Sequence, residues 1–440
     1  MSNRKFFLQT FGCRLNQAES GEAERLLFNC GWQKVATADQ ADLILLNTCA
    51  VTRKAEKEVR QTTSRLRKIN PKAKIALAGC WVDKIKKFGG LVPEGIDLMV
   101  RNKGKWKELI QSLKIKSQKN TPGVSFLTPP GWKRNPRVLI RIQTGCSNNC
   151  AYCLPRLIRG KPKSVPVKDI IARINKAVKR GTLEVVLTGQ NISQYRDHGK
   201  DWINLTEEIL KKTEIKLLRF GSINPSLVDD PTTSFSVQAK RLINFYQGLG
   251  KGRLSRHLHL SSQSGSGRVL KLMNRNYRSE IFLELVKLLR GGVKGINITT
   301  DIIVGFPGET EKDFLKTVRF AQKAKFGKIH IFRFSVRAGT LAAKMERGLG
   351  RVSEAIKTNR AERLAKIEKE LRFKFWRSQI GKSAMAIILP GGKGLSDNYI
   401  PLMVKKAKTE KVSKIAKVKF VALKGNFVAA VADFTSIDVK

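Results

Sequence analysis

The chain has 440 residues and a formal net charge of +50, from 85 Lys and Arg against 35 Asp and Glu. This length predicts two or three domains, and a hydrophobic fraction of 41% is enough for packed cores. No apolar run is long enough to cross a membrane and no signal peptide is evident, so we expect a soluble, cytoplasmic protein. The positive charge favours binding to a polyanion such as nucleic acid, although Lys and Arg spread over every solvated face would give the same net charge.

The first part of the chain, residues 1–115, alternates strand and helix patterns. The expected strands and helices lie at 5–9, 16–29, 41–46, 53–69 and 74–78. This βαβαβ order predicts an α/β domain with a parallel sheet.

A cysteine follows each of these three strands, at Cys13, Cys49 and Cys80. Ligands of an open α/β sheet bind at the carboxyl edge, so these distant cysteines would converge there. We interpret them as metal ligands, with one buried thiol per strand end as the alternative. Cys30 precedes Gly31 at a helix end, and we interpret it as a buried apolar thiol.

Residues 116–135 have the Pro, Gly and polar composition of a linker. The central domain, residues 136–375, then repeats a strand-and-helix pattern six times, which predicts a partial or full (β/α) barrel with its chemistry at the carboxyl ends of the strands. The expected strands lie at 138–142, 184–187, 217–220, 257–260, 295–303 and 329–334.

Three more cysteines, Cys146, Cys150 and Cys153, follow the first of these strands with C-x3-C-x2-C spacing. Thiolates are soft ligands, and three of them leave one coordination position open. Zinc with three cysteines and an open position would be unusual without a nearby histidine, and none of the four histidines is close in sequence. The loop therefore predicts a [4Fe–4S] cluster with one open iron, with a zinc knuckle or incidental thiols as alternatives.

Glycine-rich turns follow several later strands. Gly189 and Gln190 follow the second strand, Gln263 the fourth and Gly305 the fifth. Glycine lets backbone amides approach a ligand closely, so we predict that these residues contact an adenosyl cofactor, with ordinary βα turns as the alternative. We interpret Asp301 as a buried, hydrogen-bonded polar residue rather than as a support for the ligand.

A long basic helix with a docking face is expected at about 352–378. Residues 378–440 then predict a small all-β barrel, of a type that often binds oligonucleotides. The basic loop at 405–414 would contact RNA, unless it is a solvated charged hairpin. The expected strands lie at 384–389, 399–404, 418–421 and 426–432.

The three parts together resemble the methylthiotransferases, a radical S-adenosylmethionine (SAM) family that modifies tRNA or, in one branch, a ribosomal protein. The C-terminal barrel resembles a TRAM domain, the RNA-binding module of that family. One departure is the early proline of Leu154-Pro155, since the family commonly has it later. The motifs that carry the resemblance lie at 9–20, 47–52, 78–80, 144–160, 259–266 and 301–310.

The resemblance implies two [4Fe–4S] clusters and SAM as cofactors. One cluster would cleave SAM to a radical that abstracts hydrogen from C2 of an adenine in the anticodon loop of tRNA. The other would carry sulfur, and a second SAM would supply the methyl group. Flavodoxin or ferredoxin is the expected electron donor, and no catalytic residue is assigned beyond the cluster ligands. The implied ligands are Cys146, Cys150 and Cys153 for the first cluster, and Cys13, Cys49 and Cys80 for the second.

Within the family, the opening motif at 9–16 resembles the enzymes that act on N6-threonylcarbamoyladenosine-37 more closely than those acting on N6-isopentenyladenosine-37. The latter usually have Gln-Met-Asn where this chain has Arg14-Leu15-Asn16. A threonylcarbamoyl group carries a carboxylate that Arg14, Arg156 or Arg159 could pair with, although phosphate contact or surface charge would also explain these arginines.

Three alternatives stay open beside the threonylcarbamoyl substrate. The chain could act on the isopentenyl nucleoside, or on an aspartate of a ribosomal protein, whose enzymes typically begin Leu-Gly-Cys-Pro-Lys-Asn. It could also be a non-catalytic, metal-containing RNA-binding protein.

Overall fold

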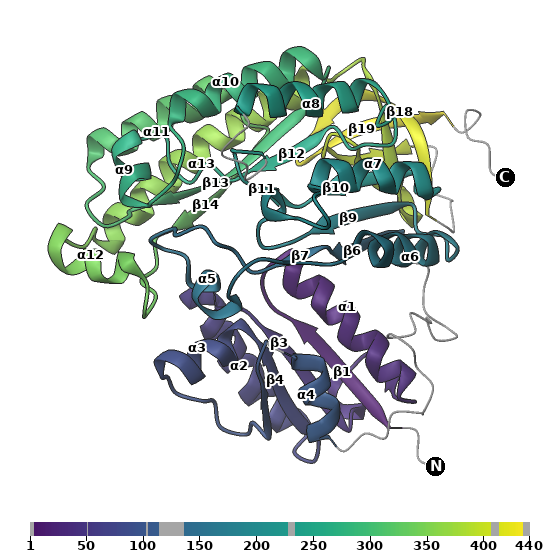
Figure 1. Ribbon diagram of the computed structural model, residues 1–440, viewed down its shortest axis with the longest axis vertical. Helices are drawn as coiled ribbons and strands as arrows, with labels where there is room; N and C mark the ends of the chain where they lie inside the picture. Colours follow the sequence, from purple (N-terminus) through teal and green to yellow (C-terminus); the bar gives the residue numbers. More distant parts are fainter. Residues whose placement is uncertain are drawn as a thin grey trace. The chain divides into compact units, whose positions relative to one another are not determined.

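The computed structural model describes residues 4–50, 52–102, 104–113, 136–227, 234–405 and 413–433. The chain forms two compact α/β units (Figure 1). Unit 1 comprises Met1–Lys133, Thr144–Pro162 and Ser335–Ala343, and unit 2 comprises Arg134–Gln143, Lys163–Phe334 and Lys344–Lys440. The cysteine loop that follows the first central strand thus belongs to the N-terminal unit. The expected linker at 116–135 lies outside the described residues, as does most of the basic loop at 405–414.

Unit 1 is built on a five-stranded parallel sheet of order β2-β1-β3-β4-β5. The expected βαβαβ order is confirmed, and β2, β5, α3 and α4 are additions to it. The strands are β1 (Lys5–Thr10), β2 (Gln33–Lys34), β3 (Leu43–Thr48), β4 (Lys74–Gly79) and β5 (Leu98–Val100). The helices are α1 (Arg14–Asn29), η1 (Ala38–Gln40), α2 (Arg53–Ile69), α3 (Cys80–Phe88), α4 (Lys105–Ser112) and, in the cysteine loop, α5 (Leu154–Arg159).

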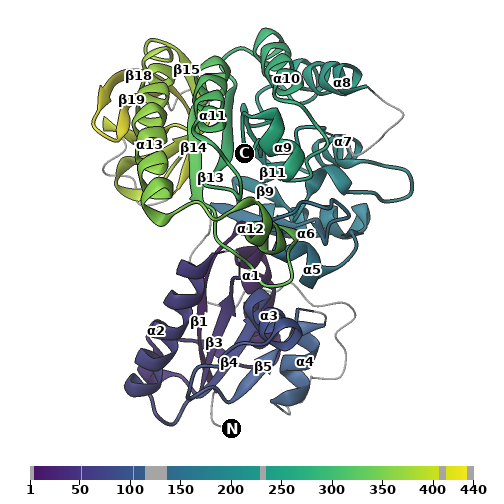
Figure 2. The ribbon, with the colours of Figure 1, turned by 90° about the vertical axis from the view of Figure 1, so that its left-hand side faces the viewer.

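The central strand β3 shows why both faces of this sheet are covered. Leu43 and Leu45 pack in one core with side chains of α1 and α4, whereas Ile44 and Leu46 pack in a second core with α2 and α3. Alternate side chains of a strand point to opposite faces, so a continuous apolar run requires helices on both sides. Figure 2 shows α2 on one side of these strands and α4 on the other. The carboxyl edge of the sheet is left to carry the site.

Unit 2 contains two parallel sheets, β10-β9-β6 and β11-β12-β13-β14. All six expected strands are present, and among the described residues neither sheet closes on itself, so the partial barrel is the form observed. The strands are β6 (Arg137–Arg141), β9 (Glu184–Thr188), β10 (Leu217–Phe220), β11 (Ser222–Ile223), β12 (His257–Leu260), β13 (Asn297–Val304) and β14 (Lys328–Arg333), with the short strands β7 (Gln143–Thr144) and β8 (Lys163–Ser164) near the cysteine loop.

The helices of this region are α6 (Val167–Val178), η2 (Ile192–Gln194), α7 (Trp202–Lys212), α8 (Phe235–Gln247), α9 (Gly267–Leu272), α10 (Ser279–Gly292), α11 (Glu311–Ala324) and α12 (Leu341–Leu349), of which α12 follows the last strand and begins in the segment assigned to unit 1. Apolar side chains of α6, η2, α7, α8, α10 and α11 pack into one core. None of the helices in the described ranges combines the length and apolarity that crossing a bilayer requires.

The C-terminal part of unit 2 is the expected β-barrel, which closes in the order β15-β16-β17-β19-β18. The strand β16 was not predicted, because its sequence Lys-Gly-Leu-Ser has little strand character. The long helix α13 (Glu354–Arg377) has the predicted docking role, since Leu364 lies in the core of the partial barrel and Trp376 in the core of the closed barrel. The barrel elements are β15 (Ser383–Ile388), η3 (Pro390–Gly392), β16 (Lys393–Ser396), β17 (Pro401–Val404), β18 (Lys414–Lys424) and β19 (Phe427–Asp433).

Candidate metal centre

The three N-terminal cysteines lie at the carboxyl ends of three neighbouring parallel strands. Cys13 is the residue before α1, Cys49 directly follows β3, and Cys80 is the first residue of α3, directly after β4. The strands β1, β3 and β4 are adjacent in the sheet, so the turns that follow them meet at one edge. The convergence expected from the sequence is therefore present.

Two glycines allow these turns to close together. Gly12 has φ +89°, and a Cβ atom built there would lie 2.5 Å from Cys49 Sγ. Gly79 has φ +104°, and a Cβ atom there would lie 2.5 Å from Thr48 O. Only a residue without a side chain fits both the left-handed backbone and the space. The turn before Cys13 thus packs against Cys49, and the turn before Cys80 packs against Thr48.

The environment of Cys13 shows that the thiols influence one another. Its side chain keeps accessible surface, but the surrounding atoms displace enough water that burial raises the pKa of the Cys13 thiol. The backbone of Asn16 and the Arg159 guanidinium act to lower this pKa, and the Cys80 thiol acts to raise it. A site where thiols and a guanidinium share an electrostatic environment is suited to binding metal as thiolates.

The two ends of the second cysteine loop, at residues 145–146 and 160–161, lie close together and form its neck, and a glycine allows this approach. Gly145 has φ +77°, and a Cβ atom there would lie 2.0 Å from Lys161 O, so the two strands of the neck run in close contact. The Cys146 amide donates to Gly160 O at 3.0 Å and closes the neck. At the other end, Ala342 N donates to Ala151 O at 2.8 Å and attaches the segment at 335–343 to the loop.

The three thiols of this loop form a second group, in which Cys150 is buried and Cys146 and Cys153 are partly exposed. The Cys153 amide donates to Cys150 O at 3.1 Å. Burial, together with the neighbouring Cys150 and Cys146 thiols, raises the pKa of Cys153 to about 12. Metal binding must therefore displace a proton from the Cys153 thiol, since the thiolate is the ligand.

The early proline of the loop has a local explanation. Leu154 and Pro155 are the first two residues of α5, where the missing amide of proline breaks no helical hydrogen bond. Leu154 is 1% exposed and belongs to the same apolar core as Trp81 of α3. The departure from the family pattern thus leaves the three cysteines of the loop in place.

A buried carboxylate, Glu19 of α1, lies beside the N-terminal cysteines. Arg159 Nη1 and Nη2 donate to its two oxygens at 2.6 and 3.1 Å, and Lys105 Nζ donates to Oε2 at 2.6 Å. Burial alone would raise the pKa of Glu19, but Arg159 and Lys105 hold it well below its usual range. The carboxylate is therefore ionised, and both cations are held in place by it.

Arg159 also reaches the thiol of Cys80. Its Nε lies 3.2 Å from Cys80 Sγ, and its Nη2 donates to Asn16 Oδ1 at 3.0 Å. Arg159 was one of three arginines considered as partners for a substrate carboxylate. That expectation is wrong for this residue, because its donors are already used inside the protein.

Asparagines complete this network. Asn16 Nδ2 donates to Phe11 O and Thr48 O at 3.0 and 2.8 Å, and Asn47 Nδ2 donates to Asn16 O at 2.8 Å. Neither Glu19 nor Asn16 was predicted as a site residue from the sequence. The signal available was their spacing, since both fall on the buried side of α1 with Ala23 and Leu27, where polar residues need partners.

A second arginine stands near Cys49. Arg337 Nη1 donates to Glu56 Oε1 at 2.7 Å, and Lys84 Nζ donates to the same carboxylate at 2.9 Å. Burial lowers the pKa of Arg337, whereas Glu56 and the Cys49 thiol act to raise it. Each N-terminal thiol thus has a guanidinium group near it, Arg159 for Cys13 and Cys80 and Arg337 for Cys49, which suits an anionic cluster.

Within the described ranges no three His, Cys, Asp or Glu side chains close around a single metal ion. In an iron–sulfur cluster each cysteine binds a different iron, so its ligands do not need to share one centre. Two groups of three thiols, one with arginines beside it, therefore fit a cluster better than a mononuclear zinc site.

The predicted cofactor contacts lie in unit 2, at the carboxyl ends of their strands. Gly189 directly follows β9, but a Cβ atom there would lie 3.0 Å from Gln143 Oε1, so a neighbouring side chain uses the space. The Gln190 amide donates to the same Gln143 oxygen at 3.0 Å. The side-chain amide of Gln190 is buried and makes no hydrogen bond to the described residues, so it has capacity for a ligand.

Gln263 and Gly305 both have positive φ angles, but their contacts differ. Gln263 has φ +67°, which is rare for a residue with a side chain, and its amide donates to Asp301 O at 2.8 Å. Gly305 has φ +73°, and a Cβ atom there would lie 2.3 Å from Cγ of Lys357. Packing against α13 therefore explains the glycine at 305 without a ligand.

Two residues interpreted from the sequence as buried, Asp301 and Cys30, are only partly buried in the structure. Asp301 is hydrogen-bonded, with its Oδ2 at 3.1 Å from His259 Nε2, and the pKa of Asp301 is lowered by His259 although burial acts to raise it. Cys30 packs against the core formed with α1 and α4, and burial raises the pKa of its thiol. It behaves as a partly buried apolar group.

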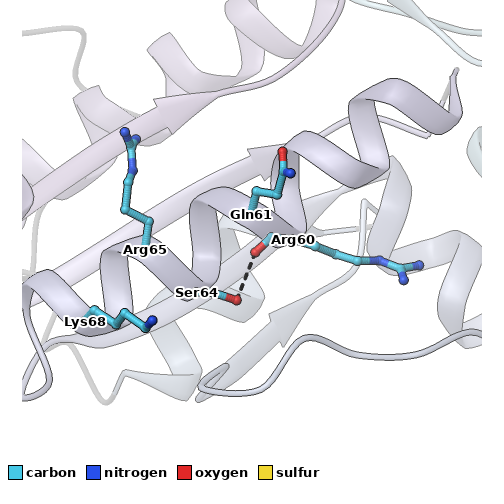
Figure 3. A pocket seen from close by; sticks show the side chains of 5 residues that line it. All are labelled: Arg60, Gln61, Ser64, Arg65 and Lys68. Atoms are coloured by element: carbon cyan, nitrogen blue, oxygen red, sulfur yellow. Dashed lines mark hydrogen bonds between the residues drawn. The ribbon is translucent and has the colours of Figure 1, made fainter.

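An open groove of about 520 Å³ runs along α2 in unit 1. The side chains of Arg60, Arg65 and Lys68 point in different directions along it, and Ser64 Oγ donates to the helix at Arg60 O (Figure 3). No cysteine lines this groove. It is a basic helix face without the converging polar groups of a built site.

Comparisons with known proteins match two parts of the chain to protein families. Residues 140–321 match the Radical SAM superfamily, and residues 5–97 match a family described as the uncharacterized protein family UPF0004. The fold of the chain is similar to that of TsrM from Kitasatospora setae, a radical S-adenosylmethionine methyltransferase, with a TM-score of 0.54 and 14% identity over 78% of this chain and 77% of that one.

Two curated relatives are similar over most of their length. The tRNA-2-methylthio-N(6)-dimethylallyladenosine synthase of Thermodesulfovibrio yellowstonii is 34% identical over 380 residues, which is 84% of each chain. The threonylcarbamoyladenosine tRNA methylthiotransferase MtaB of Thermotoga maritima is 35% identical over 381 residues, covering 85% of this chain and 84% of the relative.

The superfamily match, the partial barrel and the C-x3-C-x2-C loop together define a radical SAM enzyme, which uses an iron–sulfur cluster and SAM. The extended similarity to the curated relatives then shows that the chain belongs to the radical SAM methylthiotransferase family.

Proposed function

We propose that this chain is a tRNA methylthiotransferase that acts at C2 of N6-threonylcarbamoyladenosine-37, using two [4Fe–4S] clusters. Cys146, Cys150 and Cys153 are the proposed ligands of the cluster that binds SAM, and Cys13, Cys49 and Cys80 those of the second cluster. When bound, the clusters and SAM supply the electron, the radical, the sulfur and the methyl group. The convergence of three cysteines at the carboxyl edge of one parallel sheet supports the second ligand set.

The remaining tasks belong to the residues of the chain. The proposed contacts to SAM are made by Gly189, Gln190, Gln263 and Gly305, which lie at or beyond the carboxyl ends of β9, β12 and β13. The support is strongest for Gln190, whose buried side-chain amide has no hydrogen bond among the described residues. A buried amide without hydrogen bonds costs free energy, and a ligand that accepts and donates hydrogen bonds would remove that cost.

The preference for the threonylcarbamoyl group rests on a guanidinium that is free to bind it. With Arg159 committed to Glu19, Arg156 is the stronger candidate for pairing with the substrate carboxylate. It lies in α5, three residues after Cys153, and its Nε is buried without a hydrogen bond in the described part of the chain. An apolar wall would be expected instead for an isopentenyl group.

The base at position 37 must leave its stack before C2 can be reached, and a loop of tRNA makes this step easier. Flavodoxin or ferredoxin is the proposed electron donor, and the cytoplasm the proposed location. The isopentenyl substrate is the second candidate, because relatives at similar identity carry both names.

The test supplies the purified, reconstituted enzyme with tRNAs that carry either modification. We expect faster methylthiolation of the threonylcarbamoyl tRNA by mass spectrometry of the nucleosides. The variant Arg156→Gln should raise KM for that tRNA and leave KM for the isopentenyl tRNA unchanged. Faster reaction of the isopentenyl tRNA by the unaltered enzyme would overturn the substrate and leave the reaction class standing.

A further inference from the structure

Arg159 connects the two groups of cysteines within unit 1. It is the last residue of α5, the helix that starts immediately after Cys153, and its Nε lies 3.2 Å from Sγ of Cys80. A second donor, Asn102 Nδ2, lies 3.6 Å from the same sulfur. The sulfur of Cys80 therefore faces a fixed cation and an amide, which come from elements outside its own helix.

The direction of this guanidinium is fixed by three further contacts. Its Nη atoms donate to both oxygens of Glu19 and to Asn16 Oδ1, and Nη1 lies 3.3 Å from Thr144 Oγ1. The side chains of Arg159 and Glu19 are only 4% and 6% exposed. A planar guanidinium held in this way can present Nε in only one direction, and it stays charged at every physiological pH.

We propose that Arg159 is a positioning residue that sets the reduction potential of the cluster bound by Cys80. This inference rests on the proposed function, in which Cys80 is a cluster ligand. Reduction adds negative charge to a cluster, and a cation that donates to a ligand sulfur stabilises the reduced form. Arg159 thus raises the potential, whereas the carboxylate of Glu19 opposes it from behind the guanidinium.

The position of Arg159 gives this arrangement a second consequence. The residue is placed by the loop that holds Cys146, Cys150 and Cys153, so the potential at Cys80 depends on that loop being folded.

The electrons for the measurement come from dithionite and one-electron mediators, and the cluster is the group reduced.

The experiment is a redox titration of the reconstituted full-length chain, followed by EPR. Added SAM marks the cluster of the 146–153 loop, which leaves the signal of the other cluster identifiable. Arg159→Gln should shift the potential of that cluster to more negative values, and Arg159→Lys should restore part of the shift. Glu19→Gln, whose amide can still accept from Arg159, should shift it in the positive direction.

The matched control is Lys87→Gln, which removes an equal charge from the interface of α3 and α5. Lys87 Nζ donates to Leu157 O at 2.9 Å and does not contact Cys80. No shift is expected for this variant. An unchanged potential in Arg159→Gln, or shifts of the same sign in Arg159→Gln and Glu19→Gln, would overturn the proposal. If Arg159→Gln fails to load iron, the shift in Glu19→Gln tests the proposal instead: a positive shift supports it and a negative shift refutes it.

A separate variant distinguishes failure of the underlying assignment. If Cys80→Ala keeps both EPR signals and the full iron content, Cys80 is not a ligand, and the proposed function fails at this residue. If Cys80→Ala loses one signal while Arg159→Gln leaves the potential unchanged, only the role given to Arg159 is refuted.

Discussion

Arg219 of the partial barrel donates its Nη2 to the carbonyl of Ser396 in the C-terminal barrel, at 3.0 Å. Its Nη1 donates to Asp397 O at 3.1 Å and its Nε to Glu184 Oε1 at 2.5 Å, and the side chain is 1% exposed. Arg256 forms an ion pair with the Asp397 side chain at 2.7 Å. The barrel thus covers a buried ion pair between strands β9 and β10, and it is part of the folded core of unit 2.

This arrangement predicts a stability defect in Arg219→Leu. The substitution leaves the buried Glu184 carboxylate with Arg137 as its remaining ion-pair partner, and it removes two hydrogen bonds to the barrel. We expect the free energy of unfolding in urea to fall by about 3–5 kcal/mol. The double variant Arg219→Leu/Glu184→Leu should recover part of this loss, because no uncompensated charge stays buried. Equal stability of the single and double variants would contradict this account.

The same ion pair gives the defect a pH dependence. Burial would raise the pKa of Glu184, but Arg219 and Arg137 together lower it below its ordinary value of 4.5. A carboxylate with a lowered folded-state pKa stabilises the fold above the unfolded-state value and loses this effect as the pH falls. The stability difference between the native chain and Arg219→Leu should therefore be full above about pH 4.5 and shrink below it.

The position of Arg219 under the barrel also changes how RNA binding by the barrel can be tested. Removing residues after Ser378 would uncover Arg219 and Glu184, so lost activity in such a truncation would report misfolding. Lys417 and Lys419 are exposed on β18, and alternate residues of a strand share a face. We expect Lys417→Ala/Lys419→Ala to weaken tRNA binding and to reduce the slope of log K against log salt by about one for each phosphate that these lysines neutralise.

The control for this measurement is Lys312→Ala/Lys316→Ala, which removes the same charge from exposed positions on α11. Equal losses of affinity in both double variants would mean that the total charge of the chain matters and the barrel face does not.

The strands that carry the cysteines could be predicted from the sequence because apolar periodicity marks each strand directly. The strands β1, β3 and β4, the six central strands and the helix α2 were placed with small errors at their ends. The strand β16 and the short strands β2 and β5 were missed, since their pairing depends on neighbours far away in the sequence. The role of Arg159 could not be predicted, because no local pattern indicates that its guanidinium is bound by Glu19, 140 positions earlier. Long-range polar networks of this kind leave only a weak mark on the sequence.

The two cysteine groups are expected to separate in function. Cys146→Ala should abolish formation of 5′-deoxyadenosine, because two thiolates cannot hold a cluster with one distinct open iron. The triple variant Cys13→Ala/Cys49→Ala/Cys80→Ala should keep cleaving SAM but stop inserting sulfur into tRNA. Both products are measured by mass spectrometry of anaerobic reactions.

Cys30→Ala is the matched control, since Cys30 lies in the same unit and packs as an apolar side chain. It should leave both products unchanged. Retained SAM cleavage in Cys146→Ala, or a loss in Cys30→Ala equal to that of the triple variant, would refute the ligand sets.

The close packing of Gly12 against Cys49 gives a test that leaves every cysteine in place. In Gly12→Ala the new Cβ atom would lie 2.4 Å from Cβ and 2.5 Å from Sγ of Cys49, on a backbone with φ +89°. Cys49 must move, so the N-terminal cluster should be lost and the iron content should fall by about four atoms per chain, from about eight.

Gly31→Ala is the control, because Gly31 has φ +82° and nothing within 4 Å of the added atom. Both variants bear the cost of left-handed backbone, of order 1 kcal/mol, and only Gly12→Ala should lose iron and sulfur insertion while keeping SAM cleavage. Equal iron content in the two variants would show that the turns at Gly12 and Cys49 do not need to close for the cluster to bind.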